Sequence, residues 1–495
     1  MKHFYYYIFV ALLLCSACYE DDSQSAFQDA ETITISGIGS YTAERGITVV
    51  TIEPEVSSNY DAEWEYLWEY YQSSSDTGKI FLSNEKNLST TFDINSGSWG
   101  LVFTATNKKT GVSKNVTANL SIVTPYTVGW YVLKDDGERT DLDLFDTEEV
   151  VPKTDSPKLT NVIASRNKSN LEGKAIKMGY HTAYRGDRKT SSRVLCLISE
   201  KGYGIYDTQD MSCRQDASNY SFEDLPANPD ALYISGENFI YINNGLLYPS
   251  SASGTGYYTN PQTLDEGTNY RLSPFMAVCY GYIFFDELSG SFVYANMYGE
   301  QMKYCSNGTD DIAPLNTGMT CIYMGACTYK GYGVFESKAT GERKILNYSI
   351  STRPNVKVQE ALDGNDRLNK ASMITIANEE KVMYFVDEQG DVWSHMLNTT
   401  GDETLEFDVP ADETVTLLRQ VRHYYYNPIN HILVGTSKGE GKNATYTIRM
   451  FKRVGGHFEP EDEAMRLTGN GYAKDANYCS TSGSTDFYRY SELYR

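Results

Sequence analysis

A basic segment within an acidic chain is the first candidate for ligand chemistry. The 495-residue chain carries a formal net charge of −22, yet residues 166–193 contain eight lysines and arginines against two acids. Within this segment Tyr184, Arg185 and Arg188 combine an aromatic ring with two guanidinium groups, which suits sugars with acidic groups or peptide carboxylates. We therefore expect ligand binding at these three residues. The alternative is a loop whose cations balance acidic neighbours.

The motifs that could support catalysis are weaker. Residues 435–439 match G-x-S-x-G, but a nucleophile elbow joins a strand to a helix, and here a second strand follows, so we expect a hairpin turn. In VDEQGDVW we expect a turn shaped by Asp387 and Gly390. No histidines have metal-ligand spacing, and the carboxylates are too numerous to single out an acid and a base. We expect no catalytic residues, cofactor or metal site, with Ca²⁺ left open at 134–143 and 363–367.

Seven hairpins supply the elements that must position any site. Each consists of an apolar strand, a polar turn containing glycine, and a second apolar or aromatic strand. The turn glycines of the last six hairpins recur every 43–51 residues. The hairpins span residues 130–145, 194–207, 239–250, 282–296, 332–348, 382–397 and 431–451.

This period predicts a β-propeller with about four strands in each blade. We expect an all-β fold in which seven blades is the best estimate and six to eight remain open. The two ends of the propeller segment are expected to close one blade together, since a hairpin cannot bury its face alone. The 41 tyrosines fit a strand-rich chain.

The segment before the hairpins has a different pattern. Residues 31–124 contain short alternating strands broken by glycine and proline, including a hairpin over 101–123 that turns at Lys109, Thr110 and Gly111. About ninety residues of this kind are typical of one β-sandwich. We therefore expect a sandwich at 31–124 and a propeller-like domain at 127–495.

The N-terminal residues read as an export signal. An apolar run over residues 8–14 is too short to span a bilayer, and Ser16, Ala17 and Cys18 follow it. This ending resembles the lipobox of bacterial lipoproteins, although Cys15 stands where leucine is normal. We expect a signal peptide at 1–17, a lipid on Cys18 and a tether at 18–30. The alternative is an ordinary signal peptide cut after Ala17.

Residues 125–145, PYTVGWYVLKDDGERTDLDLF, resemble a junction in the PKD-like family lipoproteins of Bacteroidota. In that family a lipobox and a PKD/Ig-like domain precede a Gly-Trp-x-Val-Leu start of a longer β-rich region. Gly129, Trp130, Val132 and Leu133 match that start. The acidic residues after Cys18 resemble the signal that sends such lipoproteins to the outer face of the outer membrane. The resemblance implies that the sandwich at 31–124 is PKD/Ig-like.

The resemblance also implies an accessory lipoprotein of outer-membrane nutrient uptake, beside a TonB-dependent transporter and its surface binding lipoprotein. We therefore expect a non-catalytic binding or accessory protein that is lipid-anchored and surface-exposed, with a glycan or peptide as ligand bound by the propeller. A propeller enzyme acting on glycans or peptides is one alternative, and a structural or adhesive surface protein is another. The acidic charge disfavours nucleic acid as a partner.

The lipobox assignment predicts that acylation depends on Cys18 and not on Cys15. Each acyl methylene buried in the membrane contributes about 0.8 kcal/mol of anchoring, so Cys18→Ala should release the protein from membranes or leave its precursor uncut. Labelling with radioactive fatty acid checks this, with Cys15→Ala as the matched control that keeps the label. Label retained by Cys18→Ala would refute the assignment.

Overall fold

The computed structural model describes most of the chain and divides it into two compact units between Val123 and Thr124. The described residues are 29–72, 78–145, 147, 157, 159–186, 191–221, 225–235, 238–251, 256–258, 260–278, 281–296, 301–306, 312–327, 330–377, 380–397, 402–423, 429–480 and 483–484. Cys18 and the expected signal peptide lie outside them. In the part of the chain so described, no helix has the length and apolar composition needed to cross a membrane.

The first unit is a β-sandwich built on one five-stranded sheet and two strand pairs. The sheet has the order β2–β9–β8–β5–β6, in which only the β2–β9 pair is parallel. Its strands are β2 (Tyr41–Glu44), β9 (Ser113–Val123), β8 (Gly97–Asn107), β5 (Trp64–Gln72) and β6 (Ile80–Ser83). The pairs are β1 (Ile33–Ser36) with β4 (Glu55–Ser58), and β3 (Val50–Ile52) with β7 (Leu88–Thr90).

The alternating pattern of the first unit explains its core. On β8 the side chains of Leu101 and Phe103 are fully buried and pack with Trp68 of β5 and Leu120 of β9. Strands β8 and β9 form the hairpin expected from residues 101–123, in register from Gly97 onward. The sandwich that the sequence predicts is therefore present.

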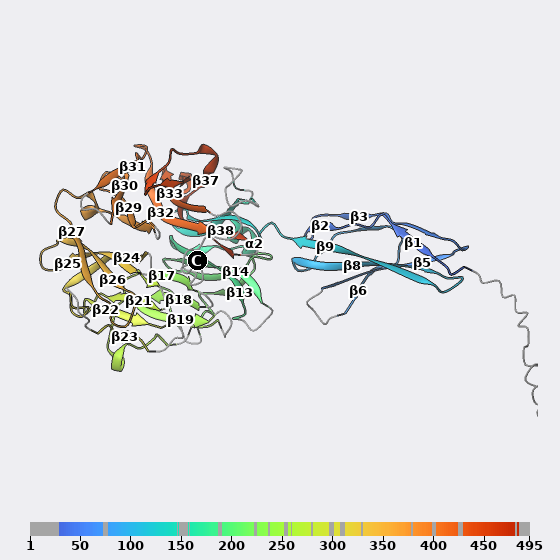
Figure 1. Cartoon of the computed structure of the whole chain (residues 1–495), viewed down its shortest axis with the longest axis horizontal. Helices are drawn as coiled ribbons and strands as arrows, with labels where there is room; N and C mark the ends of the chain where they lie inside the picture. Colours follow the sequence, from blue (N-terminus) through green and yellow to red (C-terminus); the bar gives the residue numbers. More distant parts are fainter. Residues whose placement is uncertain are drawn as a thin grey trace, which may run out of the picture. The chain divides into compact units, whose positions relative to one another are not determined.

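The described residues of the second unit form seven sheets of three to five strands, which we call blades 1 to 7 in chain order, and one small strand pair (Figure 1). Blade 1 holds β12 (Leu171–Glu172), β11 (Arg139–Phe145), β10 (Gly129–Asp135), β38 (Tyr472–Ser480) and β39 (Gly483–Ser484), with helix α2 (Val162–Asn167) before β12. Blade 2 holds β13 (Ala175–Tyr184), β14 (Ser192–Ser199), β15 (Tyr203–Asp207) and β16 (Cys213–Asp216). Blade 3 holds β17 (Pro229–Ser235), β18 (Asn238–Asn243) and β19 (Leu246–Ser251).

The remaining four blades follow the same plan. Blade 4 holds β20 (Ala277–Val278), β21 (Tyr282–Asp286), β22 (Ser291–Ala295) and β23 (Lys303–Tyr304), and blade 5 holds β24 (Met319–Cys327), β25 (Lys330–Ser337), β26 (Arg343–Ser349) and β27 (Lys357–Ala361). Blade 6 holds β28 (Met373–Ala377), β29 (Val382–Val386), β30 (Val392–Met396) and β31 (Glu403–Phe407). Blade 7 holds β32 (Thr414–His423), β33 (Ile429–Lys438), β34 (Thr445–Phe451) and β37 (Arg466–Asn470), beside the small pair β35 (Arg453–Val454) and β36 (His457–Phe458). Short 3₁₀ turns lie at Asp265–Gly267, Arg367–Lys370, Gly441–Asn443 and Glu463–Met465.

Each of the seven hairpins expected from the sequence lies in a separate blade, which confirms the propeller. The tight turns depend on glycine, since Gly245 and Gly290 adopt φ angles of 73° and 66°, a left-handed conformation that other residues rarely adopt. Figure 1 shows the blades following one another around a common centre. Strand β38 pairs with β10 along residues 472–479, so strands from the two ends of the unit complete blade 1 together, as expected.

Apolar side chains fill the space between every pair of neighbouring blades. Seven core clusters correspond to the seven junctions among the described residues. Between blades 4 and 5, for example, Phe292 packs against Phe335 and Tyr348 with ring centroids 5.4 Å and 5.0 Å away. Both faces of each sheet are buried in this way, which is why the strands read as nearly continuous apolar runs.

Several tyrosine rings of the structure lie directly on a strand glycine. Tyr71, Tyr348 and Tyr446 stand opposite Gly100, Gly331 and Gly469 in the strand register. A side-chain carbon added at any of these glycines would collide with the facing ring. The ring thus covers backbone that glycine leaves bare, which accounts for part of the tyrosine excess.

Asp475 of β38 connects blade 1 to both of its neighbours. Its carboxylate is fully buried, forms ion pairs with Lys177 of β13 (3.4 Å) and with Arg419 of β32, and accepts a hydrogen bond from the Met178 N–H (3.0 Å). Burial alone would raise the pKa of Asp475, but the charges of Arg419 and Lys177 outweigh it and hold the pKa below its ordinary value. The closing strand is thereby tied to blades 2 and 7.

We predict that Gly331→Ala destabilises the protein by about 1–3 kcal/mol, the usual cost of inserting a methyl group into a packed site. The added carbon would collide with the Tyr348 ring, which would have to leave the junction between blades 4 and 5. Denaturant unfolding checks this. Gly364→Ala is the matched control, because its added carbon meets no atom within 4 Å. Equal effects of the two variants would contradict the prediction.

We predict that Asp475→Asn costs about 3–5 kcal/mol at neutral pH, as for other buried pairs that lose one partner. Because the folded-state pKa is lowered, this stability is present above the ordinary pKa near 4 and is lost as the pH falls. The difference between parent and variant should therefore shrink on acidification, which unfolding curves between pH 3 and 7 measure. The control is Asp412→Asn, which breaks an exposed pair with Lys438 and should have a much smaller effect.

Candidate functional site

The structure places two of the three expected ligand residues and shows different environments for them. Tyr184, at the end of β13, is fully buried, and its ring meets Phe239 of blade 3 edge-on at 5.8 Å. It belongs to the core between blades 2 and 3, so it offers no stacking face to a ligand, contrary to expectation. Arg185 is exposed directly after the strand. Arg188 lies outside the described residues.

The basic segment is dispersed over separate contacts. Arg166 donates to the Asp210 carbonyl (2.9 Å), and its guanidinium lies 5.9 Å from the Tyr126 ring centroid. Lys177 reaches Asp475 at the centre of the ring. The ion pair of Lys177 agrees with the alternative in which the segment balances neighbouring acids. The cavity beside Lys177 and Arg419 has a volume of about 50 Å³, which suits a few water molecules and no sugar ring.

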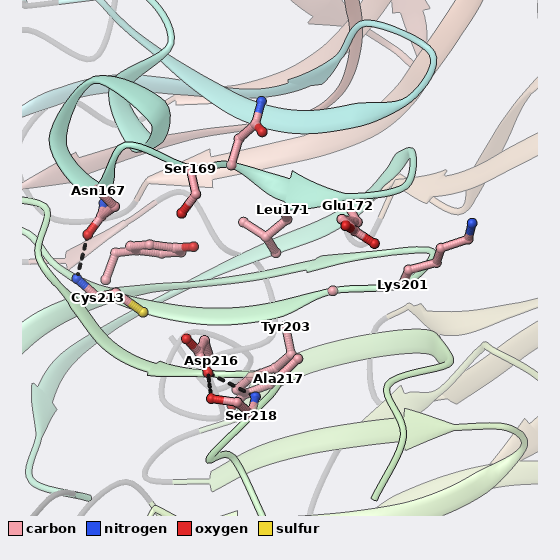
Figure 2. Close-up of a pocket in the computed structure, with 13 residues that line it drawn as sticks. Asn167, Ser169, Leu171, Glu172, Lys201, Tyr203, Cys213, Asp216, Ala217 and Ser218 are labelled. Carbon is pink, nitrogen blue, oxygen red and sulfur yellow. Dashed lines mark hydrogen bonds between the residues drawn. The ribbon is translucent and has the colours of Figure 1, made fainter.

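A larger groove lies between the outer strands of blades 1 and 2 (Figure 2). Its volume is about 530 Å³, within the range of small-molecule sites. One wall comes from the end of α2 and from β12, and the other from β15, β16 and the turns beside them. The lining residues are Asn167, Ser169, Asn170, Leu171, Glu172, Lys201, Gly202, Tyr203, Tyr206, Cys213, Asp216, Ala217 and Ser218.

Hydrogen bonds fix the two walls of the groove to each other. The Asn167 side chain accepts from the Cys213 N–H (3.0 Å) and donates to the Met211 carbonyl (2.9 Å), so α2 is held against blade 2. At Gly202 an added side-chain carbon would lie 3.0 Å from Leu171 and 2.7 Å from the Ser199 hydroxyl. The close approach of the walls therefore requires glycine there, and the groove is preformed.

Tyr206 contributes a hydroxyl that no other described residue engages. The side chain is 5% exposed and lines the groove, and its ring lies on Gly204, where an added carbon would be 2.5 Å away. Burial is the main cause that raises the pKa of Tyr206, so the hydroxyl stays protonated. The hydroxyl faces the groove that Tyr206 lines, where a ligand oxygen could accept from it.

Charged and polar groups surround that hydroxyl. Figure 2 shows Asn167 and Cys213 at one end of the groove, Glu172 and Lys201 toward the other, and Asp216 with Ser218 along its lower side. One oxygen of Asp216 accepts from the Ser218 N–H (2.8 Å) and hydroxyl (2.6 Å). The set offers both donors and acceptors in a confined space. Burial raises the pKa of the Cys213 thiol to about 11, which leaves it a poor nucleophile at neutral pH.

The other motifs have structural roles. Residues 435–439 end strand β33, and the chain returns as β34, so the expected hairpin replaces a nucleophile elbow. Asp387 accepts from the backbone N–H groups of Gln389 (2.9 Å) and Asp391 (3.0 Å), which shapes the expected turn. In the first segment left open for calcium, Asp141 accepts from the Ile163 N–H (2.8 Å). Within the described residues, no group of three or more His, Cys, Asp or Glu side chains could hold a metal ion.

The buried histidines differ in charge preference. His395 lies between Glu360 of blade 5 (2.9 Å) and Glu403 of its own blade (3.6 Å). Burial alone would lower the pKa of His395, but the contacts with these two carboxylates outweigh it and raise the pKa. For His431, burial and the charges of Lys452 and Arg453 lower the pKa to about 4. The surroundings of His395, which links two blades, therefore favour its charged form, whereas those of His431 favour the neutral form.

The sequence did not reveal the groove because its walls come from two blades. Glu172 and Asp216 are separated by a whole hairpin, and only the packing of blade 1 on blade 2 brings them together. Tyr206 stands in an apolar run that reads as scaffold. The available signal was the glycine at Gly204, two residues before Tyr206, because a strand glycine beside an aromatic residue marks a ring lying on backbone.

Comparisons with known proteins give one family match and several distant likenesses in structure. The model of a family described as PKD-like matches residues 18–175. No curated protein matches the chain. Among solved structures, a quinonprotein alcohol dehydrogenase-like protein from Bacteroides thetaiotaomicron is 13% identical, with a TM-score of 0.41 over 89% of this chain and 96% of that one.

Two further structures are similar at the same distant level. AztD from Citrobacter koseri is 10% identical, with a TM-score of 0.29 over 70% of this chain and 95% of that one. The WD40 domain of SCAP from fission yeast is 10% identical, with a TM-score of 0.31 over 61% of this chain and 70% of that one.

Proposed function

Residues 18–175 of this chain belong to the PKD-like family, and from this membership and the groove between blades 1 and 2 we propose a surface lipoprotein that binds a glycan. In this proposal a lipid on Cys18 anchors the protein in the outer membrane. The protein acts without catalysis, as a binding or accessory component of a TonB-dependent uptake system. Its partners are the transporter and the surface binding lipoprotein of that system.

The observation that carries the proposal is a preformed groove of about 530 Å³ into which Tyr206 presents a hydroxyl that no described residue engages. The lining residues include two carboxylates, one ammonium group, and several amides and hydroxyls, over an apolar floor that contains Leu171 and Ala217. Such a mixture can donate to and accept from neighbouring sugar hydroxyls while the floor contacts the ring. Glu172, Asp216 and Lys201 together give a charge of −1, which favours a neutral sugar over an anion.

The second candidate is an enzyme that cleaves glycans. Glu172 and Asp216 place two carboxylates in one groove, and glycoside hydrolysis uses such a pair as acid and as base or nucleophile. Incubating the protein with neutral oligosaccharides distinguishes the two functions. Hydrolysis that Glu172→Gln or Asp216→Asn abolishes would support the enzyme. Binding of the same oligosaccharides without cleavage would support the non-catalytic function.

We predict that Tyr206→Phe weakens the binding of neutral oligosaccharides about twofold to tenfold, the usual loss for one neutral hydrogen bond. Asp216→Asn, which changes an acceptor carboxylate to an amide, should weaken it more, since bonds to charged groups are stronger. Titration calorimetry of the full chain against a panel of oligosaccharides measures both. A panel in which no neutral glycan binds would overturn the ligand assignment.

The matched control is Tyr348→Phe. The Tyr348 hydroxyl likewise has no partner among the described residues, but it is buried at the junction of blades 4 and 5. Affinity should therefore remain unchanged in this variant. Equal losses in Tyr206→Phe and Tyr348→Phe would indicate a general effect on stability and would remove the groove as the site.

A further inference from the structure

A second pocket lies between blades 3 and 4, apart from the groove. Its volume is about 540 Å³. The loop that leads from β19 to β20 supplies most of its lining, and the β18–β19 turn and the β21–β22 turn close it. The lining residues are Asn244, Leu246, Pro261, Gln262, Thr263, Leu264, Gly267, Thr268, Asn269, Tyr270, Arg271 and Leu288.

The described lining of this pocket carries a single charge, which is positive. Among the described lining residues none is acidic and Arg271 alone is basic, whereas the whole chain carries −22. The guanidinium of Arg271 is exposed and has no ion-pair or hydrogen-bond partner among the described residues. An arginine without a partner retains its whole fork of donors for a ligand.

The backbone and stem of Arg271 are held from both blades. Its N–H donates to the buried carboxylate of Asp286 (2.8 Å), and its carbonyl accepts from the Glu287 N–H (2.8 Å). On the blade 3 side, Gly245 has a φ of 73°, and an added carbon there would lie 2.5 Å from Cγ of Arg271. The aliphatic part of the Arg271 side chain therefore lies against Gly245 in the β18–β19 turn, where any larger residue would collide with it. The guanidinium is positioned in advance at the pocket.

A buried amide gives an independent indication of a ligand. Gln262 is 9% exposed and lines the pocket, and its Nε2 has no hydrogen-bond acceptor in the described part of the chain. Its backbone is satisfied, because its N–H donates to Leu247 (2.8 Å) and its carbonyl accepts from the Tyr270 hydroxyl (2.7 Å). Buried donors in native structures have partners, so the side-chain donor of Gln262 calls for an acceptor within the pocket.

We propose that the pocket between blades 3 and 4 binds an anionic group, a carboxylate, sulfate or phosphate, carried by a small ligand. Arg271 supplies the forked, charged donor, and the amide of Gln262 supplies a neutral one. Leu288 at the rim is 60% exposed and offers apolar surface to the body of the ligand. This site is separate from the groove, and it does not depend on the proposed neutral glycan or on membrane anchoring.

Four sugars with one ring and different charge test the proposal: glucose, glucuronate, glucose 6-phosphate and glucose 6-sulfate. Saturation-transfer NMR with the full chain measures their dissociation constants. We expect at least one of the three anions to bind about tenfold or more tightly than glucose, and we expect the preference to weaken with added salt. Which anion binds most tightly distinguishes a carboxylate from a sulfate or a phosphate ligand.

Arg271→Gln should abolish this preference, because it keeps the stem over Gly245 and removes the charge. Gln262→Leu, which removes the amide, should reduce it. Arg353→Gln is the matched control, because it removes an exposed arginine that has no side-chain partner among the described residues and does not line the pocket, and it should leave the preference intact. The proposal is overturned if none of the three anions exceeds glucose, if Arg271→Gln keeps the preference, or if Asp216→Asn in the groove removes it instead.

Discussion

The ion pairs of Asp475 hold the propeller closed, and the other contacts of the second unit depend on that closure. A buried carboxylate is stable only when opposite charges and hydrogen bonds surround it. Here the two cations come from the blades on either side, Lys177 from blade 2 and Arg419 from blade 7. The charge of Asp475 is therefore compensated only when both neighbours are in place. Strand β38 is therefore stable in its place only after blades 2 and 7 have formed on either side of it.

The apolar junctions give the closed ring its rigidity, and the binding candidates use that rigidity. Neither pocket lies within a blade. Each lies where two blades meet, with one wall from each. In the groove, Gly202 lets the opposite wall approach Leu171 closely. In the second pocket, Gly245 does the same for the side chain of Arg271. Recognition residues can differ at these edges without disturbing the packed strands, as is usual for loops on a rigid scaffold.

Much of the fold could be predicted from the sequence because its signals are local. An apolar strand, a glycine turn and a second strand are contiguous, so each hairpin could be recognised alone, and their period indicated the ring. The candidate sites are not local. Tyr184 was expected to face a ligand because it stands beside Arg185, but both faces of β13 are packed against neighbouring blades, so Tyr184 lies in the core. A neighbouring blade supplies part of the environment of Tyr206, Asp216 and Arg271. A short segment of sequence therefore cannot predict it.

The place of β38 in blade 1 sets an order of events in folding. Strand β10, GWYVLKD, is buried along its whole length, yet one of its edges is covered only by residues 472–479. Until those residues are available, the folding chain is an open arc with an apolar, unpaired edge at its start, and such edges pair readily with other strands. Strand β38 of a second copy has the same sequence and can pair with that edge in the same register. Ring closure within one chain therefore competes with strand exchange between chains, and crowding favours the exchange.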